Sequence, residues 1–228
     1  MRSFLSTLLA ASVLILAGCG NDATGQRSKA TLQELSGLAK TVVGKKAAPS
    51  APADPNVMIA NTLKTFEGEP LMFALREKTG AYGIASIYGQ NGPVTTWATH
   101  DLTSFSLKQG MLVATRGFGN DLMSVEDGGA VRMITARRAG SVQKTYRFLD
   151  GQDRTNRLIL NCEIVPGELQ PVQTGEISTS AQLVRETCRM GTFKFTNTYW
   201  VDGSSRVVQS VQWAGSKNGV LIFRRLRW

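Results

Sequence analysis

The chain has few of the residues from which many active sites and small scaffolds are built. One histidine, His100, stands among 228 residues, so a histidine-rich metal centre is excluded. Three cysteines are too few for a disulfide-rich mini-protein, and 23 glycines with 7 prolines are too few for a collagen-like or low-complexity chain. A mean hydropathy of −0.10 excludes a polytopic helical membrane protein. The chain is nevertheless long enough to bury a globular core.

The first 18 residues have the pattern of a lipoprotein signal peptide. Arg2 supplies a positive start, and residues 4–16 form an apolar run that is shorter than the ~20 residues of a membrane-spanning helix. Residues 16–19 (LAGC) resemble the lipobox of bacterial lipoproteins. In that family the peptide is cut before the cysteine, which receives a diacylglyceryl group and an acyl chain on its new amine. The alternative is an ordinary secretory signal with a chance cysteine.

Lipidation of Cys19 would anchor the chain to a membrane. Each buried methylene contributes about 0.8 kcal/mol, and several acyl chains on one residue make attachment effectively permanent. The next residue is Gly20. In enteric-type sorting an aspartate at this position retains a lipoprotein in the inner membrane, so Gly20 indicates the outer membrane.

The charge of the chain is basic, with 26 Lys and Arg against 17 Asp and Glu and a net charge of +9. A basic surface favours anionic partners. Because an exported chain leaves the compartment that holds nucleic acid, we expect phosphate-bearing lipid or an acidic polysaccharide instead, and no nucleic acid.

Residues 19–56 are expected to form a tether. Residues 31–43 have apolar positions at near-helical spacing, with a capping-box signal at Thr31 and Glu34 and a stop at Gly44. This short amphipathic helix either docks onto the domain or lies on the membrane or a partner. Residues 45–56 are rich in Ala and Pro and indicate a semi-extended linker.

Residues 57–228 have the pattern of one β-rich domain, opened by a helical stretch over 57–66. Short apolar runs alternate with turn residues every 8–12 residues or so, which predicts an all-β antiparallel sandwich or barrel. The predicted strands are 71–75, 84–88, 94–99, 105–107, 111–115, 131–136, 143–148, 157–165, 192–201, 207–213 and 220–228.

Two cysteines of this domain have the parity of inward-facing strand residues. Cys162 shares a face with Leu160 and Ile164, and Cys188 shares one with Val184. Export makes a disulfide between them reasonable, since oxidising compartments allow it. The alternative is two buried free thiols too far apart to bond.

Residues that could carry catalysis do not form a convincing constellation. His100 and Asp101 are adjacent, so a strand would point them to opposite faces, away from a triad with Ser104. The carboxylate pairs lie beside glycine or proline, as solvated turns do. The glycine-rich segment from Gly117 to Asp121 lacks the Lys-Ser/Thr of a phosphate-binding loop. We therefore expect no enzyme activity, cofactor or metal.

Basic residues form two groups in the sequence. Arg137, Arg138, Lys144 and Arg147 flank a predicted hairpin, and three further arginines (Arg224, Arg225 and Arg227) mark the last predicted strand, whose even-numbered positions are apolar apart from Arg224. Either group is ordinary edge-strand charge or a contact for an anionic glycan.

Three segments carry a resemblance to a known family. Residues 112–122 (LVATRGFGNDL) resemble the T-x-G-[LF]-G-x-D-L core of the YjbF/GfcB family, and residues 197–202 (NTYWVD) and 210–213 (SVQW) resemble its C-terminal end. The resemblance spans residues 57–228. It implies an outer-membrane lipoprotein that faces the periplasm and has a barrel-like β domain. It further implies work beside an outer-membrane β-barrel protein and periplasmic partners in capsule or exopolysaccharide production or export.

These observations favour a non-enzymatic, lipid-anchored accessory that docks to its barrel partner, with Gly117, Gly119 and Asp121 in the candidate docking loop. A second hypothesis is a module that binds anionic polysaccharide through the arginine groups and Trp97, Trp200 or Trp213. A third is an enzyme that modifies polysaccharide with paired carboxylates across a cleft.

Overall fold

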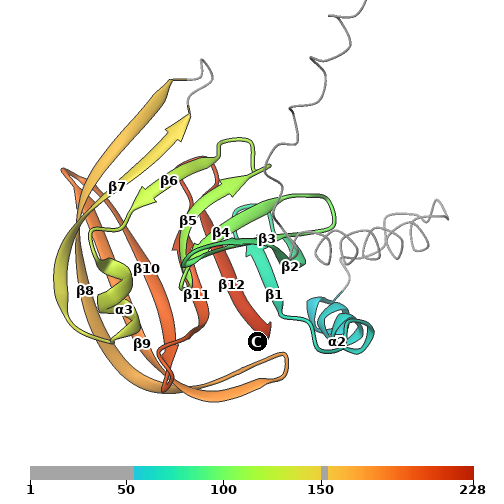
Figure 1. The fold of residues 1–228 in the computed structure, drawn as a ribbon. Helices are drawn as coiled ribbons and strands as arrows, with labels where there is room; N and C mark the ends of the chain where they lie inside the picture. The colour runs from blue at the N-terminus through green and yellow to red at the C-terminus, as the bar shows by residue number, and fades with distance from the viewer. Residues whose placement is uncertain (1–53, 150–153) are drawn as a thin grey trace, which may run out of the picture.

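The computed structural model describes residues 54–149 and 154–228. They form a 12-stranded antiparallel sheet that curls into a nearly closed barrel, with one helix outside it and a short helix on its concave side (Figure 1). The helices are α2 (Pro55–Thr65) and α3 (Ala130–Thr135). The strands are β1 (Leu71–Arg76), β2 (Ala81–Asn91), β3 (Val94–Ala98), β4 (Ser104–Lys108), β5 (Met111–Arg116), β6 (Leu122–Glu126), β7 (Gly140–Leu149), β8 (Thr155–Thr174), β9 (Ile177–Met190), β10 (Phe193–Asp202), β11 (Val207–Trp213) and β12 (Val220–Arg227).

The strand order in the sheet is β5-β4-β3-β2-β1-β12-β11-β10-β9-β8-β7-β6. The first and last strands of the chain are therefore neighbours, and β12 is paired on both sides, with β1 and with β11. The arginines of β12 are not edge-strand charge, because this strand has no free edge. The prediction of an all-β antiparallel, barrel-like domain is confirmed.

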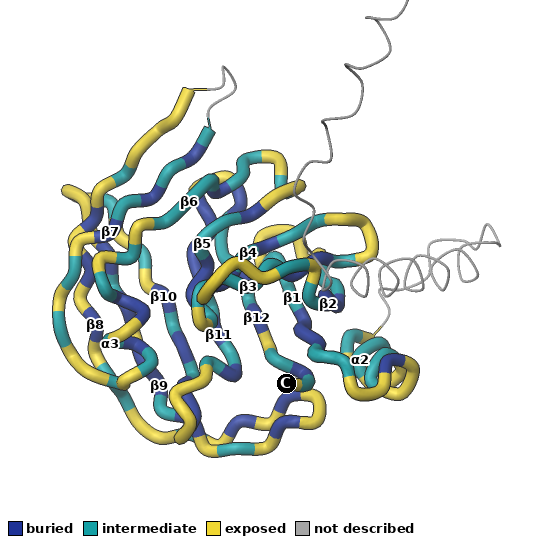
Figure 2. The backbone as a smooth tube through the Cα atoms, in the orientation of Figure 1, coloured by how far each residue is buried: buried dark blue, intermediate teal, exposed yellow. Residues whose placement is uncertain are grey.

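Alternating side chains build the interior of the barrel. In β7, the inward positions Lys144, Tyr146 and Phe148 are buried, and the residues between them are half-buried. A period of two is what a strand produces when one face meets a core and the other meets water. The main core cluster includes Trp97, Phe105 and other large side chains from most strands. Figure 2 shows the buried residues recurring along the strands.

The long strands β8 and β9 bend to wrap the barrel. Their register shifts between Pro166 and Leu169. Proline offers no N–H to the ladder, so it belongs at such an irregularity. The bulge lets a 20-residue strand curve around the core.

Helix α2 covers the outer face of the sheet near β1 and β2. Its half-buried Met58, Ile59 and Leu63 pack against a separate cluster that includes Leu71 and Phe73. Asp54 caps the helix by accepting a hydrogen bond from the N–H of Asn56 at 2.9 Å. The predicted helical stretch 57–66 is thus found two residues earlier than expected.

Helix α3 corrects one predicted strand. Residues 131–136 were expected to be extended, but Ala130–Thr135 is helical. Gly128 and Gly129 turn the chain with φ values of +57° and +94°, and Asp127 accepts a hydrogen bond from the N–H of Val131 at 3.2 Å. Apolar residues in a run of only six fit a helix or a strand equally well, and here the glycine turn and the Asp127 cap select the helix. The strands β6 and β9 were absent from the predicted set.

The barrel is closed at its seam by side chains. The edge strands β5 and β6 lie side by side, and the hydroxyl of Thr115 links them through two hydrogen bonds. It accepts a hydrogen bond from the N–H of Leu122 and donates one to Asp121, both at 2.9 Å. At the other end of the seam, Lys108 and Asp127 form an ion pair at 3.0 Å.

The predicted signal peptide, Cys19, the tether and the helix over 31–43 lie outside the described residues, so they stay predictions. Among residues 54–149 and 154–228, no helix has the length and apolar character needed to cross a bilayer.

Candidate functional site

The predicted docking loop connects the two edge strands of the barrel. Gly117 and Gly119 have φ values of +86° and +87°, which favour glycine. The carboxylate of Asp121 accepts hydrogen bonds from the N–H groups of Gly117 at 3.0 Å and Phe118 at 3.1 Å. The loop is therefore held in one shape by a residue of its own, at the end of the barrel where β5 finishes and β6 begins.

The four basic residues around β7 do not form one surface. Arg137 follows α3 and donates a hydrogen bond to the carbonyl of Asp202 at 2.5 Å. Arg147 points outward and pairs with Glu126 at 2.8 Å. Arg138 follows Arg137 in the connection to β7.

Lys144 departs from the expected surface group. Its side chain has no exposed area, because strand parity turns it inward with Tyr146 while Arg147 faces out. Lys144 is therefore not available to a glycan at the surface.

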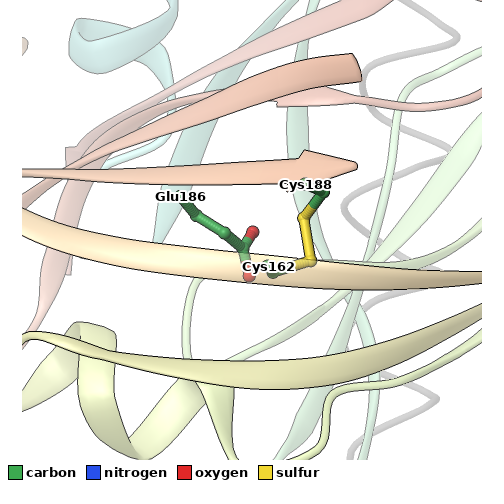
Figure 3. A group of neighbouring side chains, drawn as sticks. All are labelled: Cys162, Glu186 and Cys188. Carbon is green, nitrogen blue, oxygen red and sulfur yellow. A yellow bond between two sulfur atoms is a disulfide. The ribbon is translucent and has the colours of Figure 1, made fainter. Parts of the chain in front are cut away.

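Cys162 and Cys188 form a disulfide across the two longest strands. They are direct partners in the β8–β9 register, with an S–S distance of 2.05 Å. Figure 3 shows the carboxylate of Glu186 beside the bond. Together the three side chains have the composition of a metal-binding group. Both sulfurs are consumed in the disulfide, however, and a metal needs thiolates, so this group is not a metal site.

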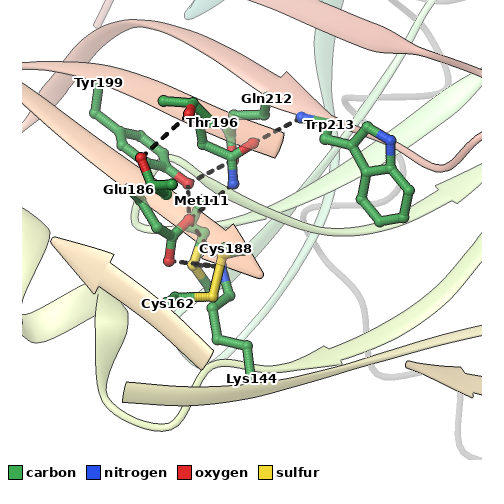
Figure 4. Close-up of a disulfide and its surroundings, with 11 residues drawn as sticks. Met111, Lys144, Cys162, Glu186, Cys188, Thr196, Tyr199, Gln212 and Trp213 are labelled. Carbon is green, nitrogen blue, oxygen red and sulfur yellow. Dashed lines mark hydrogen bonds and ion pairs between the residues drawn. A yellow bond between two sulfur atoms is a disulfide. The ribbon is translucent and has the colours of Figure 1, made fainter. Parts of the chain in front are cut away.

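A buried polar network surrounds the disulfide inside the barrel (Figure 4). Lys144 Nζ lies 2.9 and 3.0 Å from the two oxygens of Glu186. The same carboxylate accepts hydrogen bonds from the amide of Asn197 at 2.7 Å and the hydroxyl of Tyr199 at 3.2 Å. The Glu186 charge is thus matched by one cation and two neutral donors.

The network continues to the seam through Gln212. Its Oε1 accepts a hydrogen bond from the N–H of Leu112 at 2.7 Å, and it shares with Glu186 the single hydrogen of the Tyr199 hydroxyl, each oxygen at 3.2 Å. Its Nε2 donates to the carbonyl of Gly110 at 2.8 Å. Gln212 on β11 therefore satisfies backbone groups at the edge strand β5, which an open seam leaves without ladder partners.

The electrostatics of this network favour the ion pair. Burial by itself lowers the pKa of Lys144, but the adjacent Glu186 carboxylate outweighs it, and the pKa is raised above its ordinary value. Burial raises the pKa of Tyr199, and the Glu186 charge raises it further. Lys144 therefore stays protonated and Tyr199 stays neutral at any physiological pH, which suits a structural network and gives neither group a proton to transfer near neutrality.

His100 and its neighbours form a turn. Asp101 accepts hydrogen bonds from the side chain of Thr99 and the N–H of Thr103. Burial raises the pKa of Asp101, but these hydrogen bonds and His100 outweigh it and lower the pKa overall. Among the described residues, no hydrogen bond joins His100 to Asp101 or Ser104. The geometry is that of a capped turn and not of a triad.

A pocket of about 530 Å³ lies at the opposite end of the barrel from the docking loop. Its walls come from the interior faces of β3 and β12 and from the turns that precede β5 and β11. We call it the arginine pocket and define it by four of its lining residues: Trp97, Arg206, Arg225 and Trp228. Arg206 and Arg225 are its charged side chains, and no acidic residue of the described chain lines it.

Aromatic rings and guanidinium groups alternate in the arginine pocket. The Cζ of Arg225 lies 4.3 Å from the ring centroid of Trp97 and 4.9 Å from that of Trp228. Arg206 lies on Trp228 at 4.0 Å and forms an ion pair with Asp202 at 2.9 Å. Each such cation–π contact contributes about 0.5–2 kcal/mol, more as it is desolvated.

Arg225 has no such carboxylate. Within residues 54–149 and 154–228 its guanidinium makes no hydrogen bond or ion pair, and its Nε is buried without a partner. Burial, together with the charge of Arg206, lowers the pKa of Arg225 to about 10. A buried donor without a partner costs about 1–3 kcal/mol, so an anion that accepts a hydrogen bond from Arg225 would remove this cost.

The second sequence hypothesis included Arg225 and Trp97 in a glycan contact, but it did not distinguish Arg225 from Arg224 and Arg227, although a signal was present. Arg225 shares strand parity with Leu221 and Phe223, both buried in the barrel core. An arginine on an apolar face is more informative than an arginine among surface charges. The sequence instead indicated the even-numbered positions of β12 as its apolar face. One of them, Leu226, packs on the outer face of the sheet with α2.

The chain is similar to a known protein family and to two solved structures. The family described as "Group 4 capsule polysaccharide lipoprotein gfcB, YjbF" matches residues 46–226. The structure of the hypothetical lipoprotein YmcC from Escherichia coli K12 is similar with a TM-score of 0.64 and 14% identity, over 79% of this chain and 98% of that chain. A putative exported protein with a YmcC-like fold from Bacteroides fragilis is 13% identical over 71% of this chain and 95% of its own, with a TM-score of 0.32.

No curated protein matches the chain. The likeness to YmcC shows a shared fold, and the family match covers residues 46–226, which include nearly all of the described residues. The chain therefore belongs to the YjbF family of group 4 capsule polysaccharide lipoproteins.

Proposed function

We propose that the protein is a non-enzymatic accessory of capsule or exopolysaccharide production or export. Cys19 carries its lipid anchor and holds the β domain at the periplasmic face of the outer membrane. The domain docks there to an outer-membrane β-barrel protein and to periplasmic proteins of the same system. The family match over residues 46–226 is the observation that carries this proposal.

The interior of the barrel supports a binding role over catalysis. The titratable groups deepest in the core, Lys144 and Glu186, are committed to each other and to Asn197 and Tyr199. A general acid or base must reach a substrate and exchange a proton near the working pH. These groups face one another, not the arginine pocket, so their arrangement stabilises the fold.

The loop over residues 117–121 supports docking at one end of the barrel. Its shape is set by Asp121, while Gly117 and Gly119 are exposed. A preorganised loop loses less conformational entropy when a partner binds, which favours association. We assign the docking contact to this loop.

Replacement of the lipidated cysteine tests the proposal. Cys19→Ala should release the protein from membranes and abolish polymer secretion, because a soluble chain is no longer concentrated beside its membrane partner. The measurements are membrane fractionation, mass spectrometry of the N-terminal peptide and the amount of surface polymer, at equal protein levels. Normal secretion with the soluble variant would refute the need for the anchor.

A second substitution tests the membrane assignment separately. Gly20→Asp keeps the lipid but introduces the enteric inner-membrane retention signal. We expect the lipidated protein to move to the inner-membrane fraction and secretion to fall. An unchanged outer-membrane fraction under enteric-type sorting would contradict the role given to Gly20.

A further inference from the structure

We propose that the arginine pocket binds a carboxylate-bearing sugar residue, such as a uronate unit of an acidic polysaccharide. The ligand's source rests on the proposed function, whereas its chemical class rests on the pocket itself. The charge of the pocket, its aromatic walls and its polar lining each support this class of ligand.

The charge of the pocket calls for one anion. Asp202 compensates Arg206 through a 2.9 Å ion pair, and the N–H groups of Ser204 and Arg206 also donate to Asp202, both at 2.9 Å. Arg225 has no ion pair or hydrogen bond in the part of the chain that the structure describes, and its Nε is buried. A guanidinium fork matches the two oxygens of a carboxylate in bidentate geometry.

Trp97 and Trp228 indicate a ligand with an apolar face, larger than a small inorganic anion. Their rings flank Arg225 at 4.3 and 4.9 Å, and Trp228 is 37% exposed at the rim. A sugar ring presents an apolar C–H face that packs on an indole, which offers a large and rigid apolar surface. A free phosphate would leave this surface unused.

The remaining walls match a ligand rich in hydroxyl groups. Uncharged amide and hydroxyl side chains line them: Gln90, Thr95, Ser204, Ser205 and Gln209. Each can donate and accept hydrogen bonds, as sugar hydroxyls do. Apolar side chains, among them Met72, Leu107 and Phe223, also line the pocket, and they offer contacts to the C–H groups of a sugar ring. The volume of about 530 Å³ lies within the usual range for small-molecule sites.

The pocket and the docking loop lie at opposite ends of the barrel. The turns at Gly92, Gly110 and Ser205 surround the pocket end, whereas residues 117–121 connect strands at the other end. Polymer and partner protein would therefore engage the domain without competing for one surface.

Binding of defined oligosaccharides to the purified full-length protein in detergent tests the proposal. The probes are trisaccharides of galacturonate, glucuronate and mannuronate, each compared with its neutral hexose trisaccharide by calorimetry and tryptophan fluorescence. We expect at least one uronate trisaccharide to bind about tenfold or more tightly than its neutral counterpart, and its affinity to fall as salt rises. Failure of all three to bind in preference to the neutral sugars would overturn the proposal.

Two neighbouring arginines provide a matched pair of variants. Arg225→Gln should weaken uronate binding by about tenfold or more, whereas Arg224→Gln, which removes the same charge from an exposed position, should leave it unchanged. An equal loss of uronate affinity in the two variants would show nonspecific charge attraction and would refute the proposed site. If Arg225→Gln does not fold, Arg225→Lys and Trp228→Ala replace it, and both should weaken binding through loss of the fork and of the stacking surface.

A phosphorylated hexose serves as the competing anion. If it binds more tightly than every uronate, the assignment to a carboxylate-bearing sugar is wrong. The binding and secretion experiments together separate this inference from the proposed function.

Uronate binding together with normal secretion of the Cys19→Ala variant would support the pocket and refute the anchored accessory role. Loss of secretion in that variant without any uronate binding would support the accessory role and refute the pocket.

Discussion

Single residues in this barrel act according to which face of a strand they occupy. Lys144 and Arg147 are three positions apart in one strand, yet the first is sealed in an ion pair with Glu186 and the second meets Glu126 at the surface. Arg224 and Arg225 likewise occupy opposite faces, the first exposed and the second lining the arginine pocket. Parity decides the role of a charged residue here, because a charge that is turned inward loses solvation and needs a partner.

The buried pair predicts a large and asymmetric mutational effect. Lys144→Met should cost about 3–5 kcal/mol of unfolding free energy, because it leaves the Glu186 carboxylate buried without a cation. The double variant Lys144→Met/Glu186→Leu should recover a large part of that loss. Urea unfolding of both variants is the measurement. A single variant as stable as the unmodified protein would contradict the buried ion pair.

The same pair predicts the pH dependence of stability. The folded-state pKa of Lys144 is raised above its ordinary value of 10.5, so folding favours the protonated form. Its contribution is fully present below pH 10.5 and is lost as the pH rises through the folded pKa. The raised pKa of Tyr199 acts in the same direction. Unfolding free energy measured against pH should therefore fall in strongly alkaline solution, and this loss should shrink in the Lys144→Met/Glu186→Leu variant.

At the scale of elements, the seam between β5 and β6 is the place where the barrel depends on side chains. Ladders join every other neighbouring pair of strands. At the seam, side chains supply the contacts: Thr115 bonds Asp121 and Leu122, Arg116 donates to the carbonyl of Leu122 at 3.1 Å, and Lys108 pairs with Asp127. Structure held by few side chains opens more readily than structure held by a backbone ladder.

Removal of Asp121 tests this view of the seam. Asp121→Ala deletes the acceptor for Thr115, Gly117 and Phe118 and should cost about 2–4 kcal/mol. Hydrogen exchange should accelerate in β5 and β6 but not in β8 and β9. Asp54→Ala, which removes the cap of α2 on the outer face of the sheet, is the matched control and should leave exchange at the seam unchanged. Uniform acceleration in all strands would argue against a local weakness.

At the scale of the whole molecule, the disulfide joins β8 and β9, the two longest strands of the barrel. It closes a loop with a sequence separation of 26 residues. The bond lies next to the polar network and not in the arginine pocket. It therefore contributes to stability without taking part in binding.

Loss of the disulfide predicts a stability effect that leaves binding unchanged. Cys162→Ala/Cys188→Ala should lower the unfolding free energy by about 3 kcal/mol, since the unfolded chain regains the freedom of an open loop. Equilibrium unfolding in urea measures the loss, and uronate binding at low temperature provides the control. A variant of unchanged stability would show that the bond does not constrain the unfolded chain.

Much of the fold followed from local patterns, and the candidate site followed only in part. Alternation predicted most strands, and the parity of Cys162 and Cys188 placed both inside. The segment over 131–136 was misjudged because its apolar pattern suits a strand or a helix, and the turn at Gly128 and Gly129 decides between them. Arg225 and Trp97 were both named in the glycan hypothesis, but the sequence did not bring them into one pocket, because its four defining side chains come from three separate parts of the chain.

The sequence by itself determined that this is an antiparallel β protein with two inward cysteines, because side-chain direction along a strand has a period of two and is a local property. Only the tertiary structure decided which inward residues meet. It paired Lys144 with Glu186, 42 positions away, and placed Arg225 between Trp97 and Trp228. The reason is that closure of the barrel sets distances across its interior, and strand order and register fix that closure.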